Sequence, residues 1–392
     1  MPLKTNDTIK IRFYPFLYLL WFFVVMYSIE DMATSTNAYQ QQGDRSGVYI
    51  YLIGILGVLG IYYLSNFKLY TFAPMTPLLF MAIWVFADNL FLGNFYGGSR
   101  WTALTHFGLV VWWYLAIVFG YNYVSNNRYK EKQTTFLILA MFIYYCYKFI
   151  EVAIVSNETH DETTVLNLIY RVIVFIPILS LLENKWLKNA TMAMIFILTV
   201  ISMKRGALIV LPAMILVGSV LDKTKKKNIV KTIFSAIVIV VFAVVVIQVI
   251  NNMTGGFLAE RFSWESLTEG SSRSEKYAVA IETISQRNFL QFMVGIGSGP
   301  RPGVHNEILE FLVTFGFIGF CTYAAMFVSM LRRLKKLYNE RSKYAAVYGM
   351  IFVFIFMVGL YSGVCFTHST FYIMLTLGIV ERRIAEERSL YV

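Results

Sequence analysis

Charged residues, cysteines and histidines are all scarce in this chain. Only 15% of its 392 residues are charged while 57% are hydrophobic, a balance too apolar for a soluble protein. The three cysteines, Cys146, Cys321 and Cys365, lie in or at hydrophobic segments, which excludes a disulfide framework and a cysteine-based metal site. Internal repeats, low-complexity tracts and a Walker motif are missing as well. Coupling to ATP is therefore not expected.

The chain does contain a series of apolar blocks of about 20 residues, the length that crosses a bilayer. We expect an all-α polytopic membrane protein with about twelve transmembrane helices and one long external loop. The predicted spans are 13–30, 48–65, 72–92, 103–124, 134–154, 165–182, 190–203, 206–221, 229–250, 307–331, 344–364 and 366–380. The first is interpreted as a retained helix, because no small-residue cleavage site is evident. The seventh, eighth and twelfth are short, which leaves a re-entrant pair or a tilted neighbour open.

The basic residues fix the orientation of these spans. Most of the 34 Lys and Arg residues fall in alternate loops, among them 222–231, 332–343 and 381–383. The excess of Lys and Arg marks those loops as cytoplasmic, and both termini lie on the same side. Because this topology accounts for the net charge of +11, a nucleic-acid partner is not expected.

The external loop, 251–304, separates residues 1–250, with nine predicted spans, from residues 305–392, with three spans and a cytoplasmic C-terminus. We treat the three parts as one functional unit. Loops longer than about 15 residues are usually functional or disordered, and the composition of this one is not that of a disordered segment. Most basic residues predicted on the outer side lie at 204–205 or in this loop, which indicates an anionic ligand there.

Within the loop, residues 272–292 are predicted to form an amphipathic interfacial helix. Tyr277, Ile281 and Ile284 recur at helical spacing on one face. Ser272 and Glu275 form a predicted capping box, which puts Arg273 at the first helical position. Free backbone N–H groups, the positive end of the helix dipole and a guanidinium would suit phosphate oxygens. The alternative is a capped interfacial helix whose arginine touches lipid headgroups.

The sequence HNEILEFLVTFGFIG, residues 305–319, begins with one of only four histidines in the chain. Asn306 is a strong N-cap type and Glu307 follows in the first turn. One face of the predicted helix carries five residues at helical spacing: His305, Leu309, Leu312, Gly316 and Gly319. The two glycines would let a neighbouring helix approach closely. A histidine at this position is either a structural hydrogen-bonding residue or a catalyst.

The preceding GIGSGP, residues 295–300, lacks the Lys-Ser/Thr ending of a phosphate-binding P-loop and follows no soluble strand. It also lies on the predicted outer side, where nucleotides are scarce. We interpret these glycines as a mobile hinge before the next span.

These motifs together resemble the bacterial O-antigen polymerase and ligase superfamily. His305, Asn306, Gly316 and Gly319 fill the His-Asn, nine residues, Gly-x-x-Gly pattern of that superfamily. SMKRGALIVLP, residues 202–212, resembles its Ser/Thr-x-x-Arg-Gly/Ala stretch at an outer helix junction, and residues 271–284 resemble its arginine-containing loop segment. The resemblance covers about residues 200–320 by motif, in the same order and on the same side of the membrane.

The resemblance implies a glycosyltransferase with a polyprenyl-pyrophosphate-linked glycan donor, acting at the outer face of the bacterial inner membrane. Arg205 and Arg273 match the family arginines that contact the pyrophosphate, and His305 matches the catalytic histidine. An imidazole of ordinary pKa can accept the proton of the attacking sugar hydroxyl at neutral pH. Since pyrophosphate is a good leaving group, no cofactor or metal is required. Direct displacement with inversion at the anomeric carbon is expected.

Further residues are candidates for substrate binding or support, each with a plainer alternative such as helix capping or contact with lipid headgroups. They are Arg301, Asn306, Glu307, Glu310, Lys204 and Arg171. Arg171 lies mid-span, where a charge costs about 2.5–3.5 kcal/mol or more, so it should face the bundle interior and a partner. Lys148 and Glu151, three apart on one helix, are expected to satisfy each other.

Three functions remain open. A polymerase would lengthen undecaprenyl-pyrophosphate-linked repeat units of O-antigen, capsule or exopolysaccharide, and the short loop before His305 favours it. A ligase would transfer the finished glycan to lipid A-core. A flippase for lipid-linked sugars is the alternative from another class, although the two halves of the chain show no repeat. The expected partners are lipid-linked glycan donor and acceptor, membrane lipid and, for a polymerase, a chain-length regulator protein.

Overall fold

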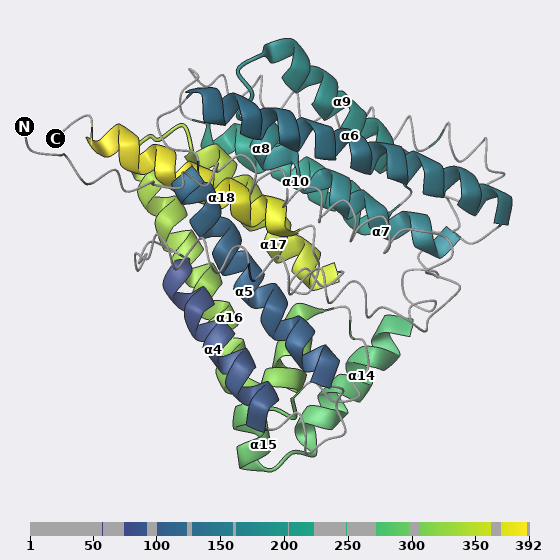
Figure 1. Cartoon of the computed structure of the whole chain (residues 1–392). Coiled ribbons are helices and arrows are strands. Elements are labelled where there is room, and N and C mark those ends of the chain that lie inside the picture. Colours follow the sequence, from purple (N-terminus) through teal and green to yellow (C-terminus); the bar gives the residue numbers. More distant parts are fainter. Residues whose placement is uncertain are drawn as a thin grey trace, which may run out of the picture.

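The computed structural model describes residues 57, 74–91, 100–123, 128–159, 162–202, 204–222, 248, 272–297, 304, 306–361 and 370–389. All regular secondary structure in these ranges is helical, which confirms the all-α class for this part of the chain. The helices, labelled in Figure 1, are α4 Met75–Phe91, α5 Arg100–Tyr123, α6 Arg128–Thr159, α7 Glu162–Ile173, α8 Ile176–Leu179, α9 Lys185–Ile201, α10 Arg205–Leu221, α14 Ser272–Ser285, α15 Phe289–Val294, α16 Glu307–Asn339, α17 Ala345–Tyr361 and α18 Thr370–Ser389.

Two described helical segments are long and apolar enough to cross a membrane, Thr135–Ile154 and Glu307–Asn339, although the second is broken at Gly316. Shorter apolar helices accompany them: Met75–Asp88, Val110–Asn122, Leu168–Leu179, Arg205–Leu221 and Ala345–Leu360. Each coincides with a predicted span, and together they fit a membrane location. The predicted spans 13–30, 48–65 and 229–250 lie outside the described residues, apart from single positions. The number of about twelve spans therefore stays a prediction.

Several helices extend beyond the predicted spans. α6 begins at Arg128 rather than near 134, α16 runs on to Asn339 rather than 331, and α18 ends at Ser389 rather than 380. The added segments are rich in Lys, Arg and Glu, which are good helix formers even where they leave the apolar layer. The predicted span 165–182, by contrast, is divided into two helices by a turn at 174–175, after which α8 begins at Ile176 with Pro177 in its first turn.

The core of the bundle is aromatic and closely packed. α5 and α18 meet through glycines: a Cβ on Gly120 would collide with the carbonyl of Leu375, and one on Gly378 with that of Ile117. Small residues of this kind let two backbones approach in membrane helix pairs. The fully buried Trp112 packs on Phe371 of α18, with ring centroids 4.8 Å apart.

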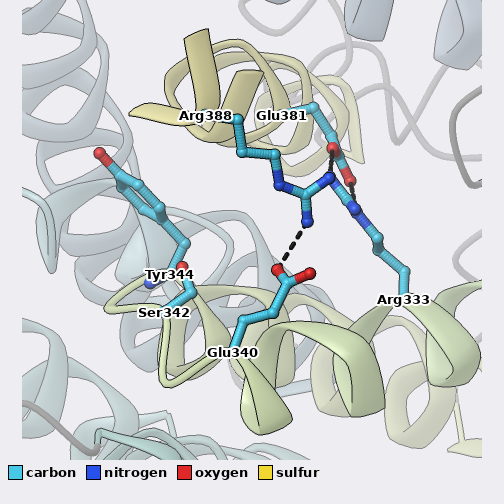
Figure 2. A network of polar contacts seen from close by, with 6 residues as sticks. All are labelled: Arg333, Glu340, Ser342, Tyr344, Glu381 and Arg388. Carbon is cyan, nitrogen blue, oxygen red and sulfur yellow. Dashed lines mark hydrogen bonds and ion pairs between the residues drawn. The ribbon is translucent and has the colours of Figure 1, made fainter. Parts of the chain in front are cut away.

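Ion pairs join α16 and α18 at the end of the bundle predicted to be cytoplasmic, which we call the inner end (Figure 2). Arg333 donates to both carboxylate oxygens of Glu381, with an Nε–Oε1 distance of 2.9 Å. Arg388 donates to Glu340 at 2.6 Å. The charged ends of α16 and α18, which the predicted topology puts on the same side of the membrane, are therefore in contact. The predicted pair Lys148–Glu151 is also confirmed, at 2.9 Å within α6.

Candidate functional site

Lys204 and Arg205 stand at the start of α10, just after a tight turn from α9. Lys204 is the N-cap residue and Arg205 the first helical residue, and both are partly buried. Ser202 shapes the turn, because its hydroxyl donates to the Thr199 carbonyl at 2.6 Å and accepts from the Lys204 N–H at 3.3 Å. Two cations therefore lie at the positive end of a helix dipole, an arrangement that an anion would stabilise.

The start of α10 lies at the same end of the bundle as the start of α16. α10 runs antiparallel to α17, because its last residue, Leu221, faces Gly349 near the start of α17 and the two helices pack along each other. Arg205 therefore lies at the C-terminal end of α17. Near that end, a Cβ on Gly359 would come within 2.8 Å of Glu307 Oε2 at the start of α16. The sequence-predicted Arg205 and the segment around Asn306 thus share one region of the fold.

Asn306 caps α16 as predicted, since its side chain accepts a hydrogen bond from the Leu309 N–H at 3.2 Å. Glu307 is only 1% exposed, and its carboxylate accepts a hydrogen bond from the Tyr323 hydroxyl. The carboxylate is thus held inside the bundle between Tyr323 and Gly359. Glu310 is partly buried one turn further on. A substrate contact for either carboxylate stays a prediction.

α16 is broken at Gly316, where φ is 65° and ψ −169°. We call residues 307–315 the first half-helix and 317–339 the second. The first half-helix runs back along the second, because the rings of Phe311 and Tyr323 stack with centroids 4.5 Å apart. Glu307 and Tyr323 are also in contact, although they would be about 24 Å apart on a continuous helix.

The single stripe expected from His305 through Gly319 is therefore wrong, because it assumed a continuous helix. Gly316 supplies the positive φ of the break and touches the Gly295 backbone, while Gly319 lies against Trp84 of α4. The expected close approach is confirmed at both glycines. At Gly316, however, the neighbour is the segment around Gly295 rather than a helix. Asn306 lies further into the bundle than the break, by about 13 Å for nine helical residues.

The four carbonyls that precede the break all accept hydrogen bonds from outside the half-helix. Arg287 donates to the Leu312 and Val313 carbonyls, at 3.0 and 2.7 Å. The N–H groups of Ile296 and Gly297 donate to Thr314 at 3.2 and 2.9 Å, and Trp84 Nε1 donates to Phe315 at 2.9 Å. The described part of the glycine segment, Gly295–Gly297, is therefore docked on the break, whereas we had interpreted it as a hinge.

The external helix α14 packs on the first half-helix through a face that includes two of the three predicted residues, Tyr277 and Ile284. Tyr277, Ala280 and Ile284 join Leu309 and Val313 in one apolar cluster. The predicted Ile281 is instead 57% exposed. Ala280 was overlooked because a small side chain hardly marks an amphipathic face, yet it lies one turn from Tyr277 and Ile284.

The predicted helix 272–292 is in fact two helices. α14 ends at Ser285, and α15 starts after Asn288, whose side chain accepts from the Gln291 N–H at 2.8 Å in a capping box. Asn is a strong N-cap residue, so the chain restarts a helix there rather than continuing the first. α14 and α15 lie across the end of the bundle where α4 ends and α5 begins (Figure 1). We call this the outer end.

The structure describes the remaining predicted site residues only in part. Arg273 is the second residue of α14, and its side chain is outside the described atoms. His305 and Arg301 lie outside the described residues, so the expectation that His305 meets Arg205 and Arg273 in one pocket stays a prediction. Arg171 is partly buried on α7, which packs against α6, α9 and α10.

A cavity of about 240 Å³ lies between the two half-helices and α17, beside the Glu307–Tyr323 contact. Its lining is entirely apolar apart from the edge of Tyr323, so it suits hydrocarbon rather than sugar. No cluster of three or more metal-ligating side chains occurs in the described ranges. The expectation of metal-free chemistry stays a prediction.

Sequence reasoning missed Arg287, Trp84 and Tyr323. Arg287 was counted only as one of several external cations, and the interior position of Gly316 in an apolar run gave no sign of a break. A signal did exist in the pairing of Gly295 with Gly316, since both need positive φ and close backbone contact. That pairing becomes visible only once the two segments are known to touch.

One comparison with known proteins identifies the region that holds these features. Residues 190–324 match the family model described as O-antigen ligase. The matched segment begins in α9 and ends in the second half-helix, so it contains Arg205, α14 with Arg273, the position of His305 and the break at Gly316. A comparison with curated proteins finds no match for the chain.

Proposed function

Because the segment 190–324 belongs to the O-antigen polymerase and ligase superfamily, we propose that this chain is a membrane glycosyltransferase that polymerises undecaprenyl-pyrophosphate-linked repeat units at the outer face of the bacterial cytoplasmic membrane. The observation that carries the proposal is that one matched segment includes the three residues to which we assign pyrophosphate binding and proton transfer. Arg205, Arg273 and His305 all lie within it.

Arg205 and Arg273 bind the donor pyrophosphate in this proposal. Both stand in the first turn of a helix, where backbone N–H groups and the helix dipole add to the attraction for phosphate oxygens. Arginine offers a planar fork of donors and stays charged near a membrane. Donors placed at a departing charge typically contribute about 10²–10³ in rate each. Lys204, Glu310 and Arg301 are candidates for further contacts with pyrophosphate or glycan, and Arg171 for a supporting charge.

His305 acts as the general base. The hydroxyl oxygen of the acceptor sugar attacks the anomeric carbon of the donor, and its proton passes to the imidazole. The bond between the anomeric carbon and the pyrophosphate oxygen breaks at the same time, and undecaprenyl pyrophosphate leaves with the bonding electrons. A single displacement inverts the anomeric configuration. Asn306 fixes the helix start immediately after this residue.

The surroundings of the helix start suit a lipid-linked donor. Asn306 is partly buried and Glu307 beside it is buried, and the neighbouring apolar cavity of about 240 Å³ can hold hydrocarbon. A pyrophosphate on a prenyl chain needs this combination of cations at one end and apolar surface at the other.

Reconstitution with defined substrates tests the proposal. The purified protein in lipid nanodiscs is incubated with undecaprenyl-pyrophosphate-linked repeat units, and the products are separated by gel and mass spectrometry. A ladder of lengthened lipid-linked glycans, formed equally with a metal chelator present and with inverted linkages by NMR, is expected. Absence of any new glycosidic bond, with translocation of the intact lipid-linked sugar instead, would overturn the proposal in favour of a flippase.

A ligase activity is the second candidate, because the matching family model is described as O-antigen ligase. The two reactions share the donor and differ in the acceptor. The same reconstitution therefore includes a parallel reaction with lipid A-core. Transfer to lipid A-core without lengthening of the repeat units would replace the polymerase by the ligase.

A further inference from the structure

We propose that Arg287 is a positioning residue that holds the first half-helix, and with it the His305–Asn306 segment, at a fixed place in the bundle. The inference rests on the proposed function for its catalytic consequence, but its structural part stands independently. It assigns a role to a charged residue that is not one of the three groups to which we assign the reaction, Arg205, Arg273 and His305. Arg287 lies in the short linker between α14 and α15.

The geometry of Arg287 is that of a helix C-cap made by a side chain. Its two terminal nitrogens donate to consecutive carbonyls, Leu312 at 3.0 Å and Val313 at 2.7 Å. The last carbonyls of a helix lack intrahelical partners and carry the negative end of the dipole. A guanidinium satisfies both requirements at once, because it supplies two parallel donors and a permanent positive charge.

A buried carboxylate of α4 also lies within electrostatic range of Arg287. Asp88, at the outer end of α4, is 3% exposed, and neither of its carboxylate oxygens accepts a hydrogen bond from the described part of the chain. The Arg287 guanidinium interacts electrostatically with this carboxylate. The direct contacts of Arg287 are therefore with the first half-helix, and Asp88 adds a longer-range attraction toward α4.

The neighbouring contacts complete the cap and explain why the break can hold its shape. Trp84 of α4 donates to the Phe315 carbonyl, and the Ile296 and Gly297 N–H groups donate to Thr314. Four successive carbonyls are thus engaged from three different segments. The Gly295 and Gly316 backbones touch, so a side chain at either position would collide.

The hydrogen bonds from Arg287, which we call the brace, matter because the first half-helix is short. Nine residues make a marginal helix in isolation, so its position depends on contacts at its ends and along its face. Asn306 lies at the opposite end from Arg287, about 13 Å away along the helix axis. A small tilt at the break therefore moves the site end by an ångström or more, and misplacement of about 1 Å can cost about 100-fold in rate.

The experiment compares Arg287→Met and Arg287→Lys with Gln286→Ala in the full chain, reconstituted in nanodiscs. Gln286 is the matched control, since it is adjacent and exposed and its side chain bonds Glu282. Hydrogen exchange of amides 309–315 reports on the half-helix. The rate of elongation at saturating undecaprenyl-pyrophosphate-linked repeat unit and the affinity for that donor report on function.

With Arg287→Met, exchange at 309–315 should rise about tenfold or more, because two charge-assisted hydrogen bonds are lost. The elongation rate per folded molecule should fall about 10- to 100-fold while donor affinity stays within about threefold of the wild type. Arg287→Lys, which keeps the charge and one donor, should recover part of both effects. Gln286→Ala should change neither.

Unchanged exchange in Arg287→Met would overturn the brace, whatever the activity. Faster exchange with an unchanged elongation rate would overturn the positioning role. If the methionine variant does not fold, Arg287→Lys and Trp84→Phe carry the test, with smaller shifts expected in the same direction. If the wild-type protein forms no polymer, the proposed function fails, and the exchange measurement alone decides whether Arg287 holds the half-helix.

Discussion

Two arginines, Arg287 and Arg333, connect α16 to the rest of the bundle at its opposite ends, and they do so in different ways. At the inner end, Arg333 pairs with the two carboxylate oxygens of Glu381 on α18 (Figure 2). At the outer end, Arg287 pairs with two backbone carbonyls at a break in the helix. The same bidentate group neutralises a buried charge in one place and replaces missing helical hydrogen bonds in the other.

The difference indicates separate roles for the two ends of the bundle, activity at the outer end and stability at the inner end. The inner end is built from regular helices joined by ion pairs such as Arg388–Glu340 and Lys343–Glu387. The outer end contains two helix starts with arginines in their first turns and a helix that turns back on itself. We therefore expect substitutions at the outer end to lower activity and substitutions at the inner end to lower stability.

The largest effect is expected from the predicted reacting groups at the outer end. His305→Ala should lower polymer formation by about 10²–10⁴, the usual contribution of a general base. Arg205→Ala and Arg273→Ala should each lower it by about 10²–10³, and lysine at either position should rescue only part. Product formation is measured with purified protein, and thermal unfolding should be nearly unchanged. Normal activity of His305→Ala would remove the base, and full activity with both arginines replaced would remove the pyrophosphate site.

A large loss of stability is expected at the inner end from Arg333→Met. The substitution leaves Glu381, which is 2% exposed, without its partner, and an unpaired buried charge costs about 3–5 kcal/mol. Thermal unfolding in detergent measures the loss. The double variant with Glu381→Met should recover most of it, because no buried charge remains. Elongation per folded molecule should be unchanged, and a marked fall in that rate would contradict the division between the two ends.

A smaller effect on both properties is expected between the two ends, at Tyr323. Tyr323→Phe keeps the ring that stacks on Phe311 but removes the hydroxyl that donates to Glu307. The free energy of unfolding should fall by about 1–3 kcal/mol, the cost of leaving a buried acceptor unsatisfied. Elongation should slow a few-fold, because this bond holds the two half-helices together near Asn306. Glu307→Gln keeps an acceptor and should be milder, so a harsher effect of the glutamine would refute this explanation.

The positions of the described helices could be predicted from the sequence because apolar block length and basic flanks are strong local signals. α10 starts one residue from its predicted position, and the Asn306 cap and the Lys148–Glu151 pair were expected. The ends of α16 and α18 could not be predicted in this way. A charged segment such as 381–389 reads equally well as a loop, and its helix depends on ion pairs with a distant part of the chain.

The break in α16 could not be predicted for a related reason. Glycine is common in membrane helices, so Gly316 and Gly319 look alike in the sequence. Only Gly316 breaks the helix, because donors from Arg287 and Trp84 and from the Gly295–Gly297 loop replace the hydrogen bonds that the break removes. Motif matching does not require knowledge of contacts between distant segments. A resemblance could therefore point to Arg205, Arg273 and His305, but not to Arg287, Trp84 or the break at Gly316.

The smallest effect is expected from the exposed pair Lys343–Glu387, at 2.6 Å. Its side chains are 56% and 41% exposed, so water screens the interaction, and Glu387→Gln should lower the free energy of unfolding by less than about 1 kcal/mol. The hydrogen bond that Lys343 donates to Glu387 raises the pKa of Lys343 above its ordinary value of 10.5. The contribution is therefore fully present below pH 10.5 and disappears as the pH rises through the raised pKa. Unfolding of wild type and variant should converge there, and also at high salt. If Glu387→Gln lowered stability as much as Arg333→Met, an exposed ion pair would contribute as much as a buried one. Burial of Glu381 would then not explain the large effect expected for Arg333→Met.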